Sequence, residues 1–153
     1  VENFADHSRS GNYDATIFHR IIDNFMIQGG DFESRTGSGG YAHNWYGYCN
    51  GDSEDSSSAC PQTSWTVGDE ANNGRNHVPG ALSMAKTNAE NTGGSQFFIV
   101  PEDSNPSHLD GVHTVFGQVS SGLSSVTDIS NVETGDSDRP VYEVRLLSVV
   151  ISA

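Results

Sequence analysis

A single guanidinium among apolar side chains is the most chemically suggestive feature of this sequence. The stretch FHRIIDNFMIQGGDF (residues 18–32) holds Arg20 and Gln28 among large apolar residues. A cation that donates a hydrogen bond in a partly dry pocket can stabilise a transition state in which charge or a lone pair develops. Such catalysis can work without a nucleophile or a metal ion.

Two other motifs fail when their context is considered. Residues 37–42 (GSGGYA) match the pattern G-x-G-x-x-A, but they neither follow a convincing strand nor open a helix, as a dinucleotide-binding loop must. His113, Asp110 and some serine could be assembled into a hydrolytic triad, yet the chain has no G-x-S-x-G elbow and the spacing does not favour one. We therefore give little weight to a dehydrogenase or a hydrolase.

Three segments together resemble one protein family. They are FHRIIDNFMIQGGDF (18–32), GALSMAKTNAENTGGSQFFIV (80–100) and HLDGVHTVFGQV (108–119). In this order and at this spacing they are similar to the cyclophilin family of peptidyl-prolyl cis–trans isomerases. The resemblance covers most of the chain apart from an enlarged loop at about 41–78. It implies a single domain over residues 1–153 and an isomerase that acts on Xaa-Pro bonds.

The chemistry of that reaction fits the residues. A prolyl amide resists rotation with a barrier of roughly 18–20 kcal/mol because its C–N bond has partial double-bond character. In the twisted amide the nitrogen becomes pyramidal and regains its lone pair, which a cationic hydrogen-bond donor can stabilise. The resemblance assigns this donor to Arg20, and no cofactor or metal is needed. A lone arginine on a strand would otherwise be read as a surface residue.

The remaining site residues are carried over from the family motif. Gln28 is expected to position Arg20, the alternative being a structural polar group on a strand. Phe97 and Phe98 are adjacent, so one should face the core and the other the groove, and the motif assigns Phe98 to the groove. The expected catalytic set is Arg20, Phe25, Gln28, Phe98 and His113, with His113 as a neutral wall of the pocket. The expected substrate-binding set is Met26, Gly37, Ala85, Lys86, Thr87, Gln96, His108 and Leu109.

His108 departs from the family pattern, because the best-known cyclophilins carry tryptophan there. We therefore expect weakened cyclosporin binding with isomerase activity mostly kept. The expected partners are proline-containing peptides and unfolded proteins. The alternative function is a non-catalytic module that holds proline-containing peptides within a larger assembly.

The elements that must position these residues are mostly short strands. The patterns predict the end of a helix over residues 1–8, strands at 17–22, 25–32, 81–85, 97–100, 114–119 and 141–151, and a short helix around 123–129. The resemblance implies an antiparallel β-barrel of eight strands capped by two helices, of which about six strands are visible here. We therefore expect the first two strands to be supplied by upstream residues or by a second chain.

The loop at about 41–78 is rich in polar residues and contains both cysteines. We favour a disulfide between Cys49 and Cys60, which would indicate an oxidising, extracytoplasmic compartment. Two free thiols remain the alternative, and they would be compatible with the cytoplasm. Asp52, Glu54 and Asp55 could bind calcium, but the segment lacks the glycine and the terminal glutamate of an EF-hand, so a solvated acidic loop is preferred.

The charge is strongly negative, at −13, with 20 acidic residues against 7 basic ones. Such a surface repels phosphates, so it argues against nucleic acid and against anionic membranes as partners. The longest apolar run, near Val144–Ile151, is too short to insert into a bilayer. Two interpretations of the charge stay open, namely adaptation to a high-salt habitat and an ordinary acidic soluble protein.

Overall fold

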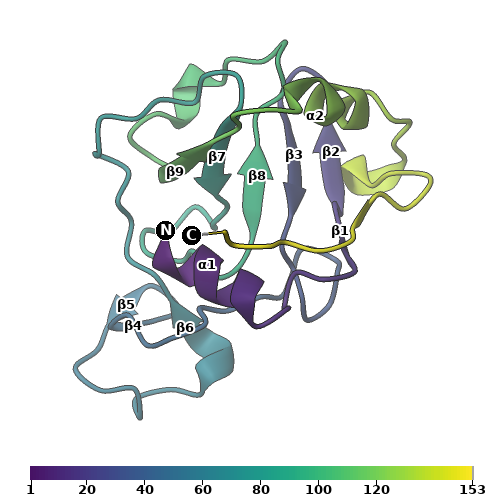
Figure 1. Cartoon of the computed structure of the whole chain (residues 1–153). Helices are drawn as coiled ribbons and strands as arrows, with labels where there is room; N and C mark the ends of the chain where they lie inside the picture. The colour runs from purple at the N-terminus through teal and green to yellow at the C-terminus, as the bar shows by residue number, and fades with distance from the viewer. Residues whose placement is uncertain (153) are drawn as a thin grey trace.

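A computed structural model of the chain describes residues 1–152. The fold is mainly β with two helices of eight residues each. The helices are α1 (Glu2–Arg9) and α2 (Leu123–Ser130), and three short 3₁₀ turns are η1 (Gln62–Ser64), η2 (Ser107–Leu109) and η3 (Asp136–Asp138). The strands are β1 (Thr16–Ile17), β2 (Arg20–Ile22), β3 (Met26–Gly29), β4 (Tyr48–Cys49), β5 (Asp52–Ser53), β6 (Trp65–Thr66), β7 (Ala81–Met84), β8 (Phe97–Ile99), β9 (Val115–Gln118) and β10 (Arg145–Leu146). Figure 1 shows their arrangement.

The main sheet has five antiparallel strands in the order β2-β3-β8-β7-β9. The hairpin between β2 and β3 turns at Asp23 and Asn24, and Asn24 adopts the left-handed conformation that such turns need, with φ of 55°. Its register places Arg20 opposite Gln28, and Gln28 in turn lies opposite Phe98 on β8. This register brings residues from two distant motifs side by side.

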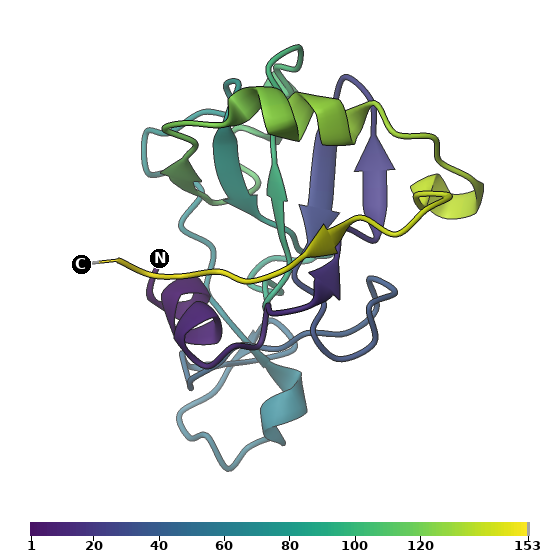
Figure 2. The same cartoon turned by 45° about the vertical axis from the view of Figure 1, so that its right-hand side comes forward.

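The two faces of the sheet bury different side chains, as the alternation along each strand predicts. One face packs Ile21, Ile27 and Phe97 against residues of both helices. The other face buries Met26 and Phe98, and it carries the predicted groove residues. Figures 1 and 2 show α2 lying across one end of the sheet and α1 near the opposite end.

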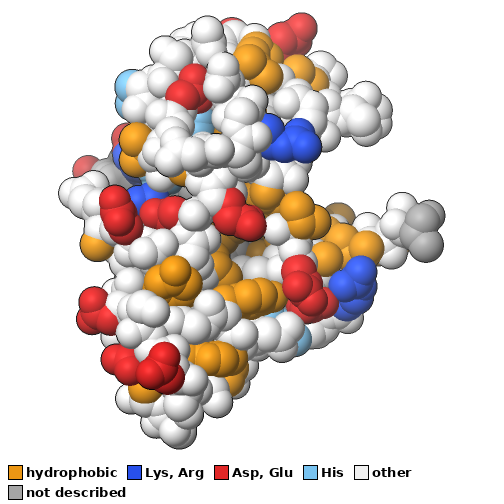
Figure 3. Space-filling view, turned by 90° about the vertical axis from the view of Figure 1, so that its left-hand side faces the viewer, with side chains coloured by type: hydrophobic (Ala, Val, Ile, Leu, Met, Phe, Trp, Pro, Cys, Tyr) orange, Lys and Arg blue, Asp and Glu red, His pale blue; other side chains and the backbone are white. Residues whose placement is uncertain are grey.

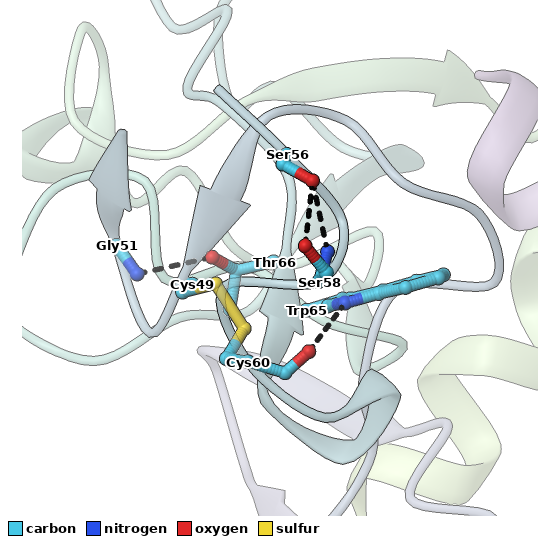
Figure 4. The surroundings of a disulfide bond; sticks show 7 residues. All are labelled: Cys49, Gly51, Ser56, Ser58, Cys60, Trp65 and Thr66. Atoms are coloured by element: carbon cyan, nitrogen blue, oxygen red, sulfur yellow. Dashed lines mark hydrogen bonds between the residues drawn. A yellow bond between two sulfur atoms is a disulfide. The ribbon is translucent and has the colours of Figure 1, made fainter. Parts of the chain in front are cut away.

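The loop at 41–78 contains a small sheet of its own, in the order β5-β4-β6. It projects beyond the end of the main sheet that lies near α1 (Figure 2). Cys49 and Cys60 are joined by a disulfide in the structure, and the indole N–H of Trp65 donates to the backbone oxygen of Cys60 at 3.3 Å (Figure 4). The acidic side chains of β5 and the following turn are exposed, and residues 1–152 contain no cluster of three His, Cys, Asp or Glu side chains that could hold a metal ion.

The strands predicted at 17–22 and 141–151 differ most from the structure. The strand expected at 17–22 is split, because β1 pairs with β10 while β2 pairs with β3. Phe18 and His19 lie at the break and are both buried, which a regular strand facing solvent on one side does not allow. The strand expected at 141–151 shrinks to β10, because among residues 1–152 β1 is the only strand that pairs with it, and Tyr142 is 82% exposed.

Within residues 1–152 the strands form an open five-stranded sheet and two smaller sheets, and the two strands expected before Val1 stay a prediction. Hydrophobic side chains line a deep notch on the side of the molecule shown in Figure 3. Neither helix of the described chain approaches the length or apolarity that crossing a bilayer requires.

Candidate active site

A cavity of about 710 Å³ opens on the face of the main sheet that carries Arg20. It gathers ten of the residues that sequence reasoning singled out, from three separate segments. These are Arg20, Phe25, Met26, Gln28, Gly37, Ala85, Lys86, Phe98, Leu109 and His113. The tertiary structure therefore brings together most of the predicted site.

The floor of this cavity is apolar. Met26 is 2% exposed and Phe98 is 4% exposed, and the partly buried Phe25 and Leu109 pack against the same cluster. Met26, Phe98 and Leu109 come from β3, β8 and η2, which lie far apart in the sequence, and Phe25 directly precedes β3. A compact aliphatic ring of the size of proline would lose its contact with water against such a floor, which favours binding.

His113 forms one wall, and its environment keeps it neutral. Its Nδ1 lies 3.0 Å from the backbone oxygen of Met84, and because a carbonyl can only accept, Nδ1 must carry the proton. Burial lowers the pKa of His113 below its ordinary value. The ring meets Phe98 edge to face, with centroids 5.7 Å apart. This geometry agrees with a neutral wall rather than a general base.

Behind Phe98 lies a fully buried histidine that sequence reasoning missed. His77 stacks on Phe98, while its Nδ1 donates to Asp110 at 2.7 Å and its Nε2 lies 2.9 Å from the hydroxyl of Ser83. An Asp–His–Ser line is thus present, but it is built on His77 and not on His113. Ser83 is 0% exposed, so its hydroxyl cannot meet a substrate as a hydrolytic nucleophile would.

Arg20 lies at the mouth of the cavity, with its side chain 43% exposed. Its Nε donates to a carboxylate oxygen of Asp138 at 3.3 Å. Gln28, which we expected to position Arg20, instead donates from Nε2 to Gln96 at 2.9 Å. Arg20 and Gln28 are thus opposite each other in the strand register, but their side chains form hydrogen bonds with other residues.

A second cavity of about 460 Å³ adjoins the first and shares Gln28, Gly37, Ala85 and Lys86 with it. It contains the predicted Thr87 and Gln96, and part of its wall comes from residues 63–66 of the disulfide-bonded loop. The ammonium group of Lys86 turns to Asp69 at 3.5 Å, and its side chain is only 4% exposed.

One buried carboxylate organises the loop between the two cavities. Asp31 is 0% exposed and accepts hydrogen bonds from the backbone N–H groups of residues 33, 34, 36, 37 and 39. Burial alone would raise the pKa of Asp31, but the hydrogen bonds from Ser34, Gly37 and Gly39 outweigh it and hold the pKa far below its usual range. The loop so held presents the carbonyl oxygens of Gly37 and Gly39 to the amide of Gln96.

Two further positions complete the description of the site. His108 lines neither of the two cavities and instead lies beside Phe25, with ring centroids 5.8 Å apart. His19 forms part of the first cavity, it is 4% exposed, and within residues 1–152 neither ring nitrogen has a hydrogen-bond partner. Burial lowers the pKa of His19, so the ring is held neutral.

Sequence reasoning also missed the segment 136–139, which lines the first cavity. It lies far from the three recognised motifs, and it is a polar turn without periodicity, so its placement depends on tertiary structure alone. His77 could have been suspected from its position just before the motif at 80–100, but an isolated histidine carries no directional signal.

Comparison with known proteins agrees with this geometry. The family model "Cyclophilin type peptidyl-prolyl cis-trans isomerase/CLD" matches residues 1–151. Peptidyl-prolyl cis-trans isomerase-like 1 of Gibberella zeae is 41% identical over 146 residues, which cover 95% of this chain and 76% of that protein. A putative peptidyl-prolyl cis-trans isomerase of Staphylococcus epidermidis is 38% identical over 175 residues, covering 97% and 78%.

The solved structures agree as well. A cyclophilin-type isomerase of Cryptosporidium parvum, crystallised in the presence of the dipeptide Ala-Pro, superposes with a TM-score of 0.80 at 31% identity, covering 99% of this chain and 84% of that one. Family model, sequence relatives and fold all lead to the same conclusion. This chain belongs to the cyclophilin-type peptidyl-prolyl cis–trans isomerases.

Proposed function

We propose that the 710 Å³ cavity holds the proline ring of an Xaa-Pro bond and that Arg20 supplies the catalytic hydrogen bond. The observation that carries this assignment is the position of a half-exposed guanidinium at the mouth of a pocket with a buried apolar floor. The floor binds the ring in either isomer, whereas the guanidinium favours the twisted amide. Only the second interaction lowers the barrier, because it is stronger in the transition state than in the ground state.

The second cavity would take the residues that precede proline. It opens beside the first and shares a wall with it, so an extended peptide can occupy both at once. Gln96 lies between them with its amide held by the carbonyl oxygens of Gly37 and Gly39. The presence of Ala-Pro with the Cryptosporidium relative supports a groove of this kind for short proline-containing peptides.

The test follows isomerisation of a short Xaa-Pro reporter peptide by exchange NMR for the wild type and for Arg20→Ala. We expect Arg20→Ala to lower kcat/KM by roughly 100-fold, the loss typical of removing one preorganised donor, while peptide binding is largely kept. Arg75→Ala is the matched control, because Arg75 is exposed and lies outside both cavities. Equal turnover by the wild type and Arg20→Ala would leave the peptide-binding module as the function.

The same groove should bind cyclosporin weakly. By the family motif, His108 corresponds to the position where the best-known relatives have an indole. In the structure its smaller polar ring lies next to Phe25 and outside the two cavities. We expect His108→Trp to tighten cyclosporin binding at least tenfold, equivalent to about 1.4 kcal/mol, with little change in kcat/KM. Inhibition of the unmodified protein at low nanomolar drug would contradict this assignment.

The clients are expected to be unfolded or loosely folded proteins that expose Xaa-Pro bonds. With a net charge of −13, the surface favours neutral or basic chains and repels nucleic acid and anionic lipid. Refolding of a protein limited by proline isomerisation, followed with and without the enzyme, tests this directly. The acceleration should disappear with Arg20→Ala.

A further inference from the structure

The η3 turn carries an acidic side chain to the catalytic arginine. Asp138 Oδ2 accepts a hydrogen bond from Nε of Arg20 at 3.3 Å, across 118 positions of sequence. Both side chains are about half exposed, so the pair is worth little as a stabilising contact. Its position matters more than its strength, because it lies at the mouth of the proposed proline pocket.

The atom used by the contact leaves the arginine competent. Nε is the inner nitrogen of the guanidinium, and both terminal nitrogens remain available to donate to a substrate amide. An arginine side chain has many rotamers, and fixing one edge of its planar fork removes much of that freedom before substrate binds. Gln28, the neighbour across the hairpin, donates its hydrogen bond to Gln96 and leaves this task to another residue.

The turn that carries Asp138 is itself held in place. Ser137 and Asp138 have φ of 59° and 58°, a left-handed conformation that is unfavourable for two successive non-glycine residues. The turn is closed by a hydrogen bond from the backbone N–H of Gly135 to the oxygen of Arg139 at 2.8 Å. The guanidinium of Arg139 also donates to the backbone oxygen of Arg35 at 2.7 Å, which ties the turn to the loop that Asp31 organises.

We propose that Asp138 is a positioning residue for the isomerase reaction, which holds Arg20 by its Nε so that the terminal nitrogens face the bound Xaa-Pro amide. This inference rests on the proposed role of Arg20. It assigns to Asp138 the part that the sequence motif led us to expect of Gln28.

The test is a double-mutant cycle measured with the Xaa-Pro reporter peptide. Asp138→Gly removes the acceptor and suits the left-handed backbone, since glycine adopts positive φ readily. We expect it to lower kcat/KM roughly five-fold, mainly through kcat, which corresponds to about 1 kcal/mol. Asp138→Asn keeps an acceptor oxygen without the charge, so kcat/KM should fall less in this variant than in Asp138→Gly.

The second half of the cycle separates positioning from structure. In an Arg20→Ala background, Asp138→Gly should change kcat/KM no further, because the group through which it acts is gone. Glu133→Gln serves as the charge control. The substitution removes one negative charge, as Asp138→Gly does, at an exposed residue that lies outside the cavity. It should leave kcat/KM unchanged.

Three outcomes would overturn the proposal. They are an unchanged kcat/KM in Asp138→Gly, an increase that shows the carboxylate restraining Arg20, and an equal loss in the wild-type and Arg20→Ala backgrounds. Failure of the proposed catalytic role looks different, because the wild type and Arg20→Ala would then turn over the peptide at the same rate.

Discussion

The imidazole of His77 lies parallel to the ring of Phe98, with the centroids 5.6 Å apart and the planes inclined by 10°. His77 is fully buried and is fixed at both nitrogens, by Asp110 on one side and by Ser83 on the other. On its opposite side Phe98 forms part of the floor of the proposed proline pocket. A polar network inside the protein therefore supports an apolar surface in the groove.

Removing His77 should affect both stability and catalysis. We expect His77→Ala to lower the free energy of unfolding by about 2–3 kcal/mol, since it leaves a cavity and takes away the partner of a buried hydroxyl. Phe98 would lose its backing, and kcat/KM should fall roughly tenfold, the equivalent of about 1.4 kcal/mol. Urea unfolding and the peptide assay measure the two effects.

His77→Phe is the informative companion. It keeps a ring against Phe98 but loses both hydrogen bonds, so it should be destabilised while retaining more of kcat/KM than His77→Ala. Equal kcat/KM in the two variants would show that the ring is not what holds Phe98.

Gly37 should tolerate no side chain. Its φ is +95°, and a Cβ atom there would lie 2.8 Å from two ring atoms of the buried His19. Gly37→Ala should lower the free energy of unfolding by roughly 1–3 kcal/mol and displace the groove wall, because it adds a clash to an unfavourable backbone conformation. Circular dichroism during heating measures the loss of stability, and the peptide assay measures the effect of the displaced groove wall on kcat/KM.

Gly47 provides the control for this prediction. It has a similar φ of +89°, but a Cβ atom there would meet nothing within 4 Å. Gly47→Ala should therefore show only the backbone cost, with kcat/KM unchanged. A loss as large as that of Gly37→Ala would assign the effect to backbone conformation instead of the contact with His19.

The protein should lose stability as the pH falls from 6.5 to 4. Burial, with a smaller contribution from the nearby His43, lowers the pKa of His7 to about 4 from the ordinary 6.5. Between these values the unfolded chain binds a proton that the folded chain does not, so unfolding becomes easier as acid is added. At pH 4 and below, the free energy of unfolding should be lower by about 3 kcal/mol because of His7. Above pH 6.5 this loss should not occur.

Replacing His7 by glutamine tests this linkage. The variant starts from a lower stability at pH 7, because the contacts of His7 with Asn12 and with the backbone of Tyr41 are disturbed. Between pH 6.5 and 4 its free energy of unfolding should nevertheless fall less steeply than that of the wild type. The two slopes should differ by about 1.4 kcal/mol per pH unit at most. Parallel pH profiles for the two proteins would contradict the assignment.

Reducing the disulfide should loosen the small sheet and spare the catalytic groove. Cys49 and Cys60 close a short loop, so their bond is worth at most about 3 kcal/mol in the chain-entropy model. None of the proposed catalytic residues belongs to this loop. Hydrogen exchange of residues 50–66 should accelerate on reduction, while kcat/KM for a short Xaa-Pro peptide stays within roughly twofold, well below the 1.4 kcal/mol of a tenfold change.

A variant with serine at both cysteine positions is the control, and it should be insensitive to reductant. A large loss of kcat/KM on reduction of the wild type would show that the loop wall at residues 63–66 shapes the second cavity more strongly than its position suggests.

Local pattern predicted the presence of both helices and of the main-sheet strands, but not the break that separates β1 from β2. Alternation placed Phe97 and Phe98 on opposite faces of their strand, and the family motif assigned Phe98 to the groove face. In the structure the two side chains belong to separate clusters on opposite faces of the sheet. Local pattern failed for residues 141–151, because a strand also needs a neighbouring strand to pair with. That partner cannot be identified from the residues of the segment alone.

The sequence by itself predicted ten of the residues that line the first cavity, because the family motifs carry their types in a recognisable order. Only the tertiary structure decided which partners those residues have. Arg20 meets Asp138 and Gln28 meets Gln96, contacts that span 118 and 68 positions of sequence. Hydrogen-bond partners depend on distances of about 3 Å between atoms, which are set when separate segments pack together and leave no periodic pattern along the chain.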